Sequence, residues 1–222
     1  IAPTGCSVGT KQGFSIIKYN GNGSAATLPH GLSQAPEFLL VKNLNGYNWA
    51  VYHKDLTSAA YYLFLNNQDG QSNNYYTFWG STDPSSTVIN LGVNNTDTNL
   101  NTNQSGISHI CYAWHSVPGL QKFGKYGGAD AFVELGFRPA VLIIKSLSSS
   151  RNWIIIDSER DTFNPSDRAL LVNDNAIEDD NSVYAIDFLS NGFKIRGSNG
   201  QIDGDTTYVY AAWAEAPAFN LY

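Results

Sequence analysis

One stretch of the sequence combines the residue types that bind carbohydrate. Aromatic rings stack on the apolar faces of sugars, while amide, carboxylate and hydroxyl groups form hydrogen bonds with the sugar hydroxyls. The segment NNYYTFWGSTDP supplies both kinds of group, and its tryptophan does not recur in the internal repeat described below. The sequence therefore predicts a glycan-binding patch made of Asn73, Asn74, Tyr75, Tyr76, Trp79 and Asp83. The alternative is an aromatic strand that alternates into the core.

Four carboxylates in the segment NDNAIEDDN form a second candidate site. Calcium takes oxygen ligands, so a loop rich in carboxylates is a candidate for binding this ion. The candidate ligands are Asp174, Glu178, Asp179 and Asp180. Their spacing does not match the EF-hand pattern, and a solvated acidic loop is the simpler interpretation. Calcium is the one cofactor that the sequence suggests.

The motifs of common enzymes are missing from the sequence. It contains no Gly-x-Ser-x-Gly, no His-Glu-x-x-His, no paired-cysteine motif and no phosphate-binding glycine loop. Its four histidines share no short metal-binding spacing: His30, His53, His109 and His115. Carboxylates such as Asp157 and Asp187 could serve glycoside hydrolysis only if the fold brought them together. We therefore expect a protein that is not an enzyme and has no catalytic residues.

Charge and hydropathy exclude two classes of partner. The formal net charge is -6 and the pI is about 5.0, and no stripe of Lys and Arg is present to replace phosphate counterions. We therefore expect no nucleic-acid partner. No segment approaches the roughly 18 consecutive apolar residues of a membrane helix, so we expect no membrane insertion. The first residue is Ile and the sequence has no Met, which suggests a piece of a longer chain.

The two cysteines, Cys6 and Cys111, are too few for a disulfide framework and lack metal-ligand spacing. Cys111 lies in the apolar run ISHICYAW, where a thiol usually packs as a small hydrophobic group. On the sequence alone, a disulfide between the two cysteines stays open.

The sequence contains one long internal repeat. The segment HGLSQAPEFLLVKNLNGYNWAVYHKDL matches LGFRPAVLIIKSLSSSRNWIIIDSER, and three residues anchor the alignment: Pro36 with Pro139, Lys42 with Lys145 and Trp49 with Trp153. Similarity continues on both sides of this match. We predict an N-terminal segment or linker at 1–12, a first repeat at 13–118 and a second at 119–222. Two copies are too few for a solenoid, so two-fold pseudo-symmetry is expected.

The repeated segments have the pattern of core β-strands. PEFLLVKN and PAVLIIKS are short apolar runs bounded by Pro and by Asn or Ser, and NWAVYH and NWIIID return as their hairpin partners. Asn191-Gly192 predicts a further hairpin turn. The segment from Asn173 to Asn181 has too few apolar positions for a helix and is expected to be a loop. The predicted fold is an all-β, antiparallel β-sandwich, jelly-roll-like, with two pseudo-symmetric repeats packed together.

These strings resemble a known family. LPHGL, APEFLLVKN and WAVYH in the first repeat, with GFRPAVLIIK, NWIIID, FLSNGFKIR and YVYAAWAE in the second, look like a duplicated domain of marine, cyanophage-like bacteriophage structural proteins. The resemblance covers nearly the whole chain from about Gly13. The first repeat departs from the Gly-Phe-x-Pro motif of Gly136–Pro139 and has a longer segment at Gly31–Pro36.

The resemblance implies an extracellular protein of the virion, in the tail or another surface appendage, that contacts other virion subunits. It also implies a homo-oligomer, with a trimer favoured because phage fibres are typically trimers. Our first hypothesis is a tail or fibre module that adheres to a host-surface glycan. The alternatives are an assembly or capsid-decoration protein without a ligand, and a polysaccharide-degrading enzyme or its carbohydrate-binding module.

Overall fold

The computed structural model of the chain describes residues 1–73, 78–93, 101–148, 150–198, 200–204 and 206–215. Within these residues the regular secondary structure is β-strand apart from one short 3₁₀ helix, so the predicted all-β fold is confirmed. The chain divides into two compact units. The first contains Ile1–Leu65 with Gln71–His115, and the second contains Asn66–Gly70 with Ser116–Tyr222.

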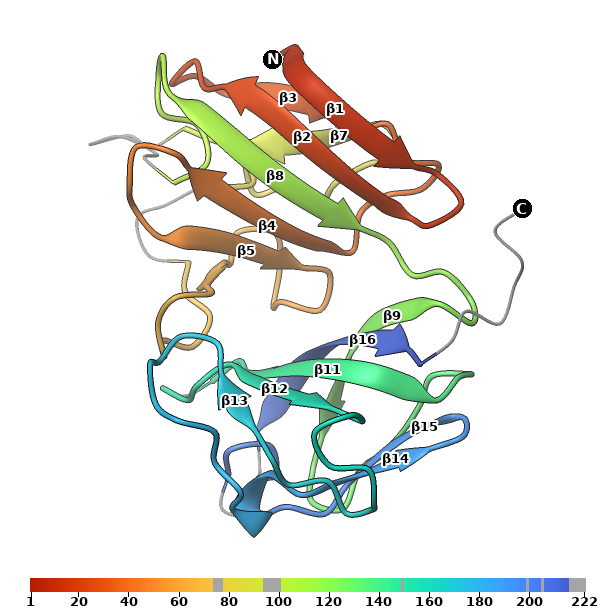
Figure 1. Ribbon diagram of the computed structural model, residues 1–222. Helices are drawn as coiled ribbons and strands as arrows, with labels where there is room; N and C mark the ends of the chain where they lie inside the picture. Colours follow the sequence, from red (N-terminus) through yellow and green to blue (C-terminus); the bar gives the residue numbers. More distant parts are fainter. Residues whose placement is uncertain (74–77, 94–100, 149, 199, 205, 216–222) are drawn as a thin grey trace. The chain divides into compact units, whose positions relative to one another are not determined.

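The first unit is built from eight strands in its described part (Figure 1). They are β1 (Pro3–Gly9), β2 (Phe14–Asn20), β3 (Ala26–Pro29), β4 (Phe38–Asn43), β5 (Trp49–His53), β6 (Leu63–Phe64), β7 (Val88–Leu91) and β8 (Ser108–Trp114). The large sheet has the order β1-β2-β8-β4-β5-β6, and a small sheet pairs β3 with β7. Every pairing is antiparallel.

The second unit has the remaining strands and the 3₁₀ helix η1 (Ser182–Tyr184). The strands are β9 (Gln121–Gly127), β10 (Phe132–Glu134), β11 (Pro139–Ser146), β12 (Ile154–Asp157), β13 (Leu170–Leu171), β14 (Ile186–Leu189), β15 (Gly192–Ile195) and β16 (Thr207–Ala214). The large sheet has the order β13-β12-β11-β16-β9, and the small sheet has the order β10-β15-β14. These pairings are also antiparallel.

The two large sheets have matching strand orders. The order β2-β8-β4-β5-β6 in the first unit corresponds to the order β9-β16-β11-β12-β13 in the second. In each, the first strand of the repeat is followed in the sheet by the last strand, and then by the others in chain order. In both sheets the last strand of the unit lies between two strands: β8 lies between β2 and β4, and β16 lies between β9 and β11. Within the described residues, β1 has no counterpart in the second unit's large sheet.

The residues expected to form an N-terminal segment or linker therefore have a different structure. Most of 1–12 belongs to β1, which pairs with β2 from Pro3↔Tyr19 to Gly9↔Phe14, with a register shift between Pro3 and Gly5. The amino group of Ile1 also donates a 2.7 Å hydrogen bond to the carbonyl oxygen of Thr27. No pattern in the sequence predicts this strand, because PTGCSVG is neither apolar nor clearly alternating.

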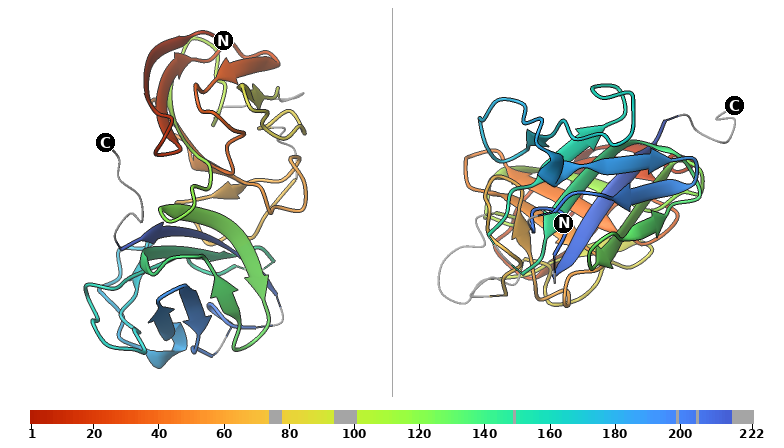
Figure 2. Two further views of the ribbon diagram at one scale, coloured as in Figure 1. Left: turned by 90° about the vertical axis from the view of Figure 1, so that its right-hand side faces the viewer. Right: turned by 90° about the horizontal axis from the view of Figure 1, so that it is seen from below.

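The core of the second unit lies between its two sheets (Figures 1 and 2). The large sheet contributes Leu142, Ile154 and Tyr210, and the small sheet contributes Ile186 and Phe193; all are buried in one apolar cluster. The first unit also buries apolar residues from both of its sheets, including Ile17, Leu28, Leu39, Val41 and Ile89. Burial of each such side chain contributes roughly 1.5–3 kcal/mol, so two apolar sheet faces are enough to hold each sandwich together.

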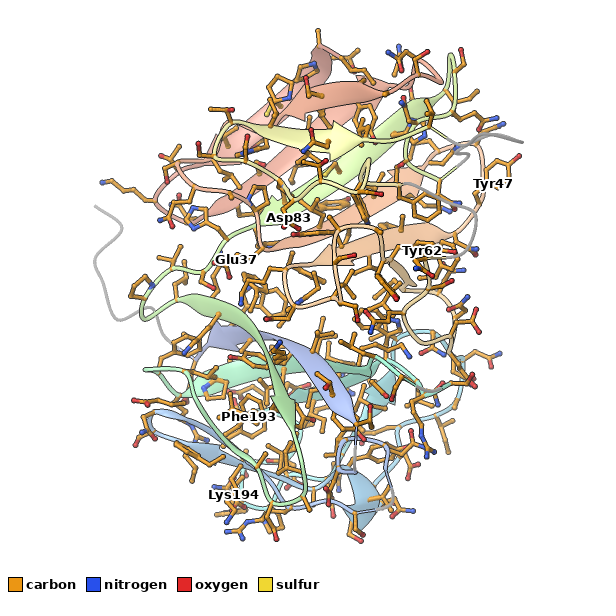
Figure 3. All side chains as sticks on the ribbon, turned by 180° about the vertical axis from the view of Figure 1, so that it is seen from behind. Glu37, Tyr47, Tyr62, Asp83, Phe193 and Lys194 are labelled. Carbon is orange, nitrogen blue, oxygen red and sulfur yellow. The ribbon has the colours of Figure 1, made fainter. Side chains whose placement is uncertain are left out.

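The repeated lysine closes the turn of each repeated hairpin. Lys42 in β4 donates from Nζ to the carbonyl oxygens of Gly46, at 3.0 Å, and Tyr47, and its ammonium lies 5.8 Å from the centre of the Trp49 ring. Tyr47, labelled in Figure 3, has a φ of 63°, so the turn contains a left-handed residue. In the second unit Lys145 donates to the carbonyl oxygen of Arg151 at 2.7 Å.

The segment Asn66–Gly70 belongs to the second unit, although it lies within the sequence of the first repeat. Its residue Gln68 accepts hydrogen bonds through the carbonyl oxygen from Lys145 Nζ, at 3.0 Å, and from the backbone N–H of Arg151, at 2.9 Å. A unit boundary drawn only from the repeat, at Pro118, misses this segment because it makes no recognisable pattern of its own.

The predicted hairpin is present, but its turn lies one residue before the predicted Asn191-Gly192, because Gly192 already belongs to β15. The residues between β14 and β15 form a tight turn at Ser190 and Asn191, since Leu189 pairs with Gly192. The segment from Asn173 to Asn181 contains no helix, as predicted.

Among the described residues, no helix has the length and hydropathy needed to cross a membrane.

Candidate binding site

The structure describes only some of the residues of the predicted glycan patch. Asn74, Tyr75 and Tyr76 lie outside the described residues, and Asn73 is exposed. Trp79 is 1% exposed and packs edge-on against Tyr52 and Phe78, with ring centres 5.8 and 6.4 Å away. Its indole ring is therefore part of the core of the first unit and offers no open face for a sugar. The ring enters the core from a turn, however, and not from the aromatic strand that was the alternative.

Asp83 is the acidic member of the predicted patch, and it remains at the surface (Figure 3). Its carboxylate accepts a 2.9 Å hydrogen bond from the hydroxyl of Tyr52. Burial raises the pKa of Tyr52, and the bond to Asp83 raises it further, so the phenol stays protonated and keeps donating. Asp83 thus anchors the turn after Trp79 to strand β5.

A surface hollow lies beside this turn. Its volume is about 460 Å³, and it is lined by Ala25, Ala26, Thr27, Gly80, Thr82, Asn90 and Leu91. The small sheet forms one wall, because Thr27 of β3 pairs with Asn90 of β7 and the two side chains share a face. The turn after Trp79 forms the other wall.

Two features hold the turn wall in place. Gly80 and Ser81 have φ values of 59° and 53°, a left-handed pair that folds the chain back so that the N–H of Thr82 donates to the carbonyl oxygen of Trp79 at 3.1 Å. The Nδ2 group of Asn90 donates to the carbonyl oxygen of Asp83 at 3.1 Å. The buried ring of Trp79 and the exposed wall of the hollow therefore belong to one continuous stretch of chain.

The chemistry of the hollow suits a neutral, hydroxyl-rich ligand. Thr27 and Thr82 supply hydroxyls and Asn90 an amide, beside the small apolar surfaces of Ala25 and Ala26. Among the described residues, the Thr27 hydroxyl has no protein partner and Asn90 Oδ1 accepts no hydrogen bond, so both are available to a ligand. No titratable side chain lines the hollow in the part of the chain that the structure describes. The site can bind and orient, but its described lining offers no general acid or base.

These lining residues were missed by the sequence reasoning. Thr27 and Asn90 are polar positions in short strands, AATLP and TVINL, that look like ordinary alternation between core and surface. Only the pairing of β3 with β7 brings them together, across more than sixty intervening residues. Of the residues predicted for the glycan patch, Trp79 and Asp83 flank the turn that forms one wall of the hollow.

One of the four carboxylates in the acidic loop, Glu178, is paired with arginine. Glu178 binds Arg160 Nη1 at 2.8 Å and lies 3.5 Å from Arg168 Nη1, while Asp174 Oδ1 accepts a 3.1 Å bond from the backbone of Ala176. Asp179 is tied into the loop through reciprocal backbone bonds with Ala169, and Asp180 is exposed. Among the described residues no three His, Cys, Asp or Glu side chains converge as a metal site. The calcium ligands predicted at Asp174, Glu178, Asp179 and Asp180 do not form such a group here.

Two histidines are held neutral by their surroundings. The Nδ1 atom of His30 accepts a hydrogen bond from the N–H of Leu32, so its Nε2 donates to the carbonyl oxygen of Ser85, at 3.1 Å. His109 donates from Nδ1 to the carbonyl oxygen of Ile107 and stacks on Tyr19 at 5.1 Å. Burial lowers the pKa of His30 and lowers that of His109 to about 4. Both side chains act as neutral parts of the first unit's interior.

The two cysteines are free and cannot pair within the chain. Cys6 of β1 and Cys111 of β8 both lie opposite Ile17, on either side of β2, so a whole strand separates them. Two strand spacings amount to about 9–10 Å between the backbones, beyond the roughly 7 Å limit for a disulfide. The disulfide that the sequence left open is therefore excluded.

Comparison with known proteins places the chain in a family. No curated protein and no solved structure matches it significantly. One family model matches residues 2–217, and its description is a domain of unknown function, DUF7483. The matched range runs through both repeats and both compact units, so the family is defined by the two together. With nearly all of its length covered by this model, the chain belongs to the DUF7483 family.

Proposed function

We propose that this protein is a non-catalytic β-sandwich module of a bacteriophage virion, of the tail or fibre type, that binds a host-surface glycan in the hollow between β3, β7 and the turn after Trp79. The hollow carries the binding part of the proposal, because its described lining combines two hydroxyls and an amide with small apolar surfaces and no titratable group. A neutral polyhydroxylated ligand matches this lining.

The virion setting rests on the resemblance of both repeats to phage structural proteins. In that setting the protein is extracellular and neighbours other virion subunits. A rigid sandwich suits adhesion because its loops can present a binding surface without disturbing the core. The alternative of a polysaccharide-degrading enzyme is less well supported, since glycoside hydrolysis needs two carboxylates about 5–10 Å apart at the sugar. The described lining of the hollow contains no carboxylate.

A glycan array with isosteric variants tests the binding site. Thr27→Val removes a ligand-facing hydroxyl but keeps a β-branched side chain in β3, and Ala25→Phe fills the hollow. Loss of one hydrogen bond costs about 0.5–1.5 kcal/mol, so Thr27→Val should raise Kd by roughly 2–10-fold, and Ala25→Phe should abolish binding. Thr162→Val is the matched control, because Thr162 is exposed, belongs to the second unit and is not among the described residues that line the hollow.

Two results would reject the proposed site. One is glycan binding that all three variants leave unchanged, which would place the ligand elsewhere on the chain. The other is no binding by folded wild-type protein on any array glycan, which would favour an assembly or decoration protein without a ligand.

A further inference from the structure

The strand β1 leaves one complete edge of the first unit's large sheet open. In the described part of the chain it pairs with β2 only, and Figure 1 shows it as the outermost strand of that sheet. The five residues Thr4–Val8 are exposed, although they lie in a regular strand. An open edge presents unpaired N–H and C=O groups, which is a template for a further strand.

Proteins usually protect such edges, and the other sheet edges described in this chain show how. β9 has Lys122 and Lys125, β10 has Glu134, and β14 has Asp187. The edge strands β6 and β13 have two residues each. The strands β3 and β7, which are both edges of the two-stranded sheet, have four residues each and no charged side chain, so they are limited by length alone. Charges and short length both discourage strand addition.

By contrast β1 has seven residues and no charged side chain. Its protection is limited to one end, where Pro3 and the register shift before Gly5 disturb the ladder. The run Gly5–Gly9 pairs regularly with β2, so its outer edge has the geometry that a neighbouring strand needs.

We propose that β1 pairs antiparallel with β1 of a second copy of this chain, across a two-fold axis near Cys6 and Ser7, so that the two large sheets become one continuous sheet. An antiparallel edge is its own complement under two-fold symmetry, so identical strands satisfy each other's open hydrogen-bonding groups. This inference does not depend on the glycan proposal.

Charge opposes the approach of a second copy least at this place. The chain has a net charge of -6, so two copies repel each other over most approaches. Like charges directly opposite in a strand pair are destabilising, but Gly5–Gly9 places none there. The small side chains Gly5, Cys6 and Ser7 allow close approach at the axis, and Val8 adds a β-branched contact on either side. Pairing of the two β1 strands leaves neither β1 edge open, so the assembly is a dimer, in contrast to the trimer that the resemblance implies.

The first test is the mass of the assembly in solution. Sedimentation analysis over a range up to about 100 μM should give twice the chain mass of 24.3 kDa at the upper end. Val8→Lys places lysines near each other across the axis and should shift the chain to monomer, raising the dimer Kd at least tenfold. Asn175→Lys is the matched control, because it makes the same charge change on an exposed loop of the second unit and should leave the dimer intact.

The second test locates the interface. Cys6 is exposed, whereas Cys111 is fully buried, so a nitroxide reagent should label Cys6 alone in the folded protein. Paired strands lie about 5 Å apart, so the distance between the nitroxides on the two Cys6 residues should be short and determined mainly by the length of the label linkers. Circular dichroism of Val8→Lys should match that of the wild type, which would show that the variant loses the dimer and not the fold.

Three results would overturn the proposal. They are a folded wild type that stays monomeric at the highest concentration, a trimeric mass, and a dimer whose Cys6 labels are far apart.

Discussion

At the scale of single residues, the buried His109 makes the stability of the folded chain depend on pH in the acidic range. Its pKa in the folded chain is about 4 because burial disfavours the imidazolium, whereas an unfolded histidine titrates near 6.5. Between these values the unfolded chain binds a proton that the folded chain does not, so this group's contribution to stability falls as the pH is lowered from about 6.5 to 4. NMR titration of the His109 ring should show no protonation at pH 5.5 in the folded protein. A midpoint near 6.5 would contradict this prediction.

The buried Lys145 makes the stability of the folded chain depend on pH in the alkaline range. The side chain is 0% exposed, and burial lowers the pKa of its ammonium to about 8, against about 10.5 in an unfolded chain. The unfolded chain therefore keeps a proton that the folded chain loses between these values, so this group's contribution to stability rises with pH from about 8 to 10.5. The unfolding free energy of wild type relative to Lys145→Met should accordingly increase between pH 7 and 9.5. An equal change in exposed Lys125→Met would show that the effect is not specific to Lys145.

At the scale of elements, Gly192 sets how closely β10 can approach β15. A Cβ atom at this position would lie 2.0 Å from the carbonyl oxygen of Val133, which is the backbone of the paired strand. Because backbone cannot move aside as a side chain can, Gly192→Ala should force the two strands apart and cost about 1–3 kcal/mol. Chemical denaturation measures this loss. Gly127→Ala is the control, since its Cβ would meet only the carbonyl oxygen of Thr206, at 3.4 Å.

The elements also show what sequence patterns can and cannot predict. Both repeated hairpins were predictable, because Pro, an apolar run, a turn and a Trp follow one another in a fixed order, and the lysine that closes each turn aligned as well. The strand β1 was not, because its stability comes from pairing with β2 and not from its own polar, glycine-containing sequence. The hollow was not predictable either, since it depends on pairing β3 with β7. Trp79 lies next to the hollow because its buried ring holds the turn from the core side.

At the scale of the whole molecule, the second unit is assembled from two separate parts of the sequence. Its main part begins at Ser116, and the segment Asn66–Gly70 comes from far upstream. The carbonyl oxygen of Gln68 supplies one of the two hydrogen bonds that Nζ of the buried Lys145 makes, and it also accepts from the N–H of Arg151. A charged or polar group that loses its partner in a buried place carries a desolvation cost of about 1–3 kcal/mol.

A fragment of residues 116–222 should therefore fold, because the apolar cluster between its two sheets is made entirely of its own residues. It should nevertheless be less stable than the same unit with its segment, because Lys145 and Arg151 lose their acceptor. Replacing Lys145 by Met should destabilise the fragment less than it destabilises the whole chain, since one of the bonds is already absent in the fragment. Denaturation of the four proteins measures this difference. Equal losses in the two backgrounds would show that Gln68 contributes nothing to the stability of the unit, whereas a fragment that fails to fold would show that Asn66–Gly70 is an obligatory part of its fold.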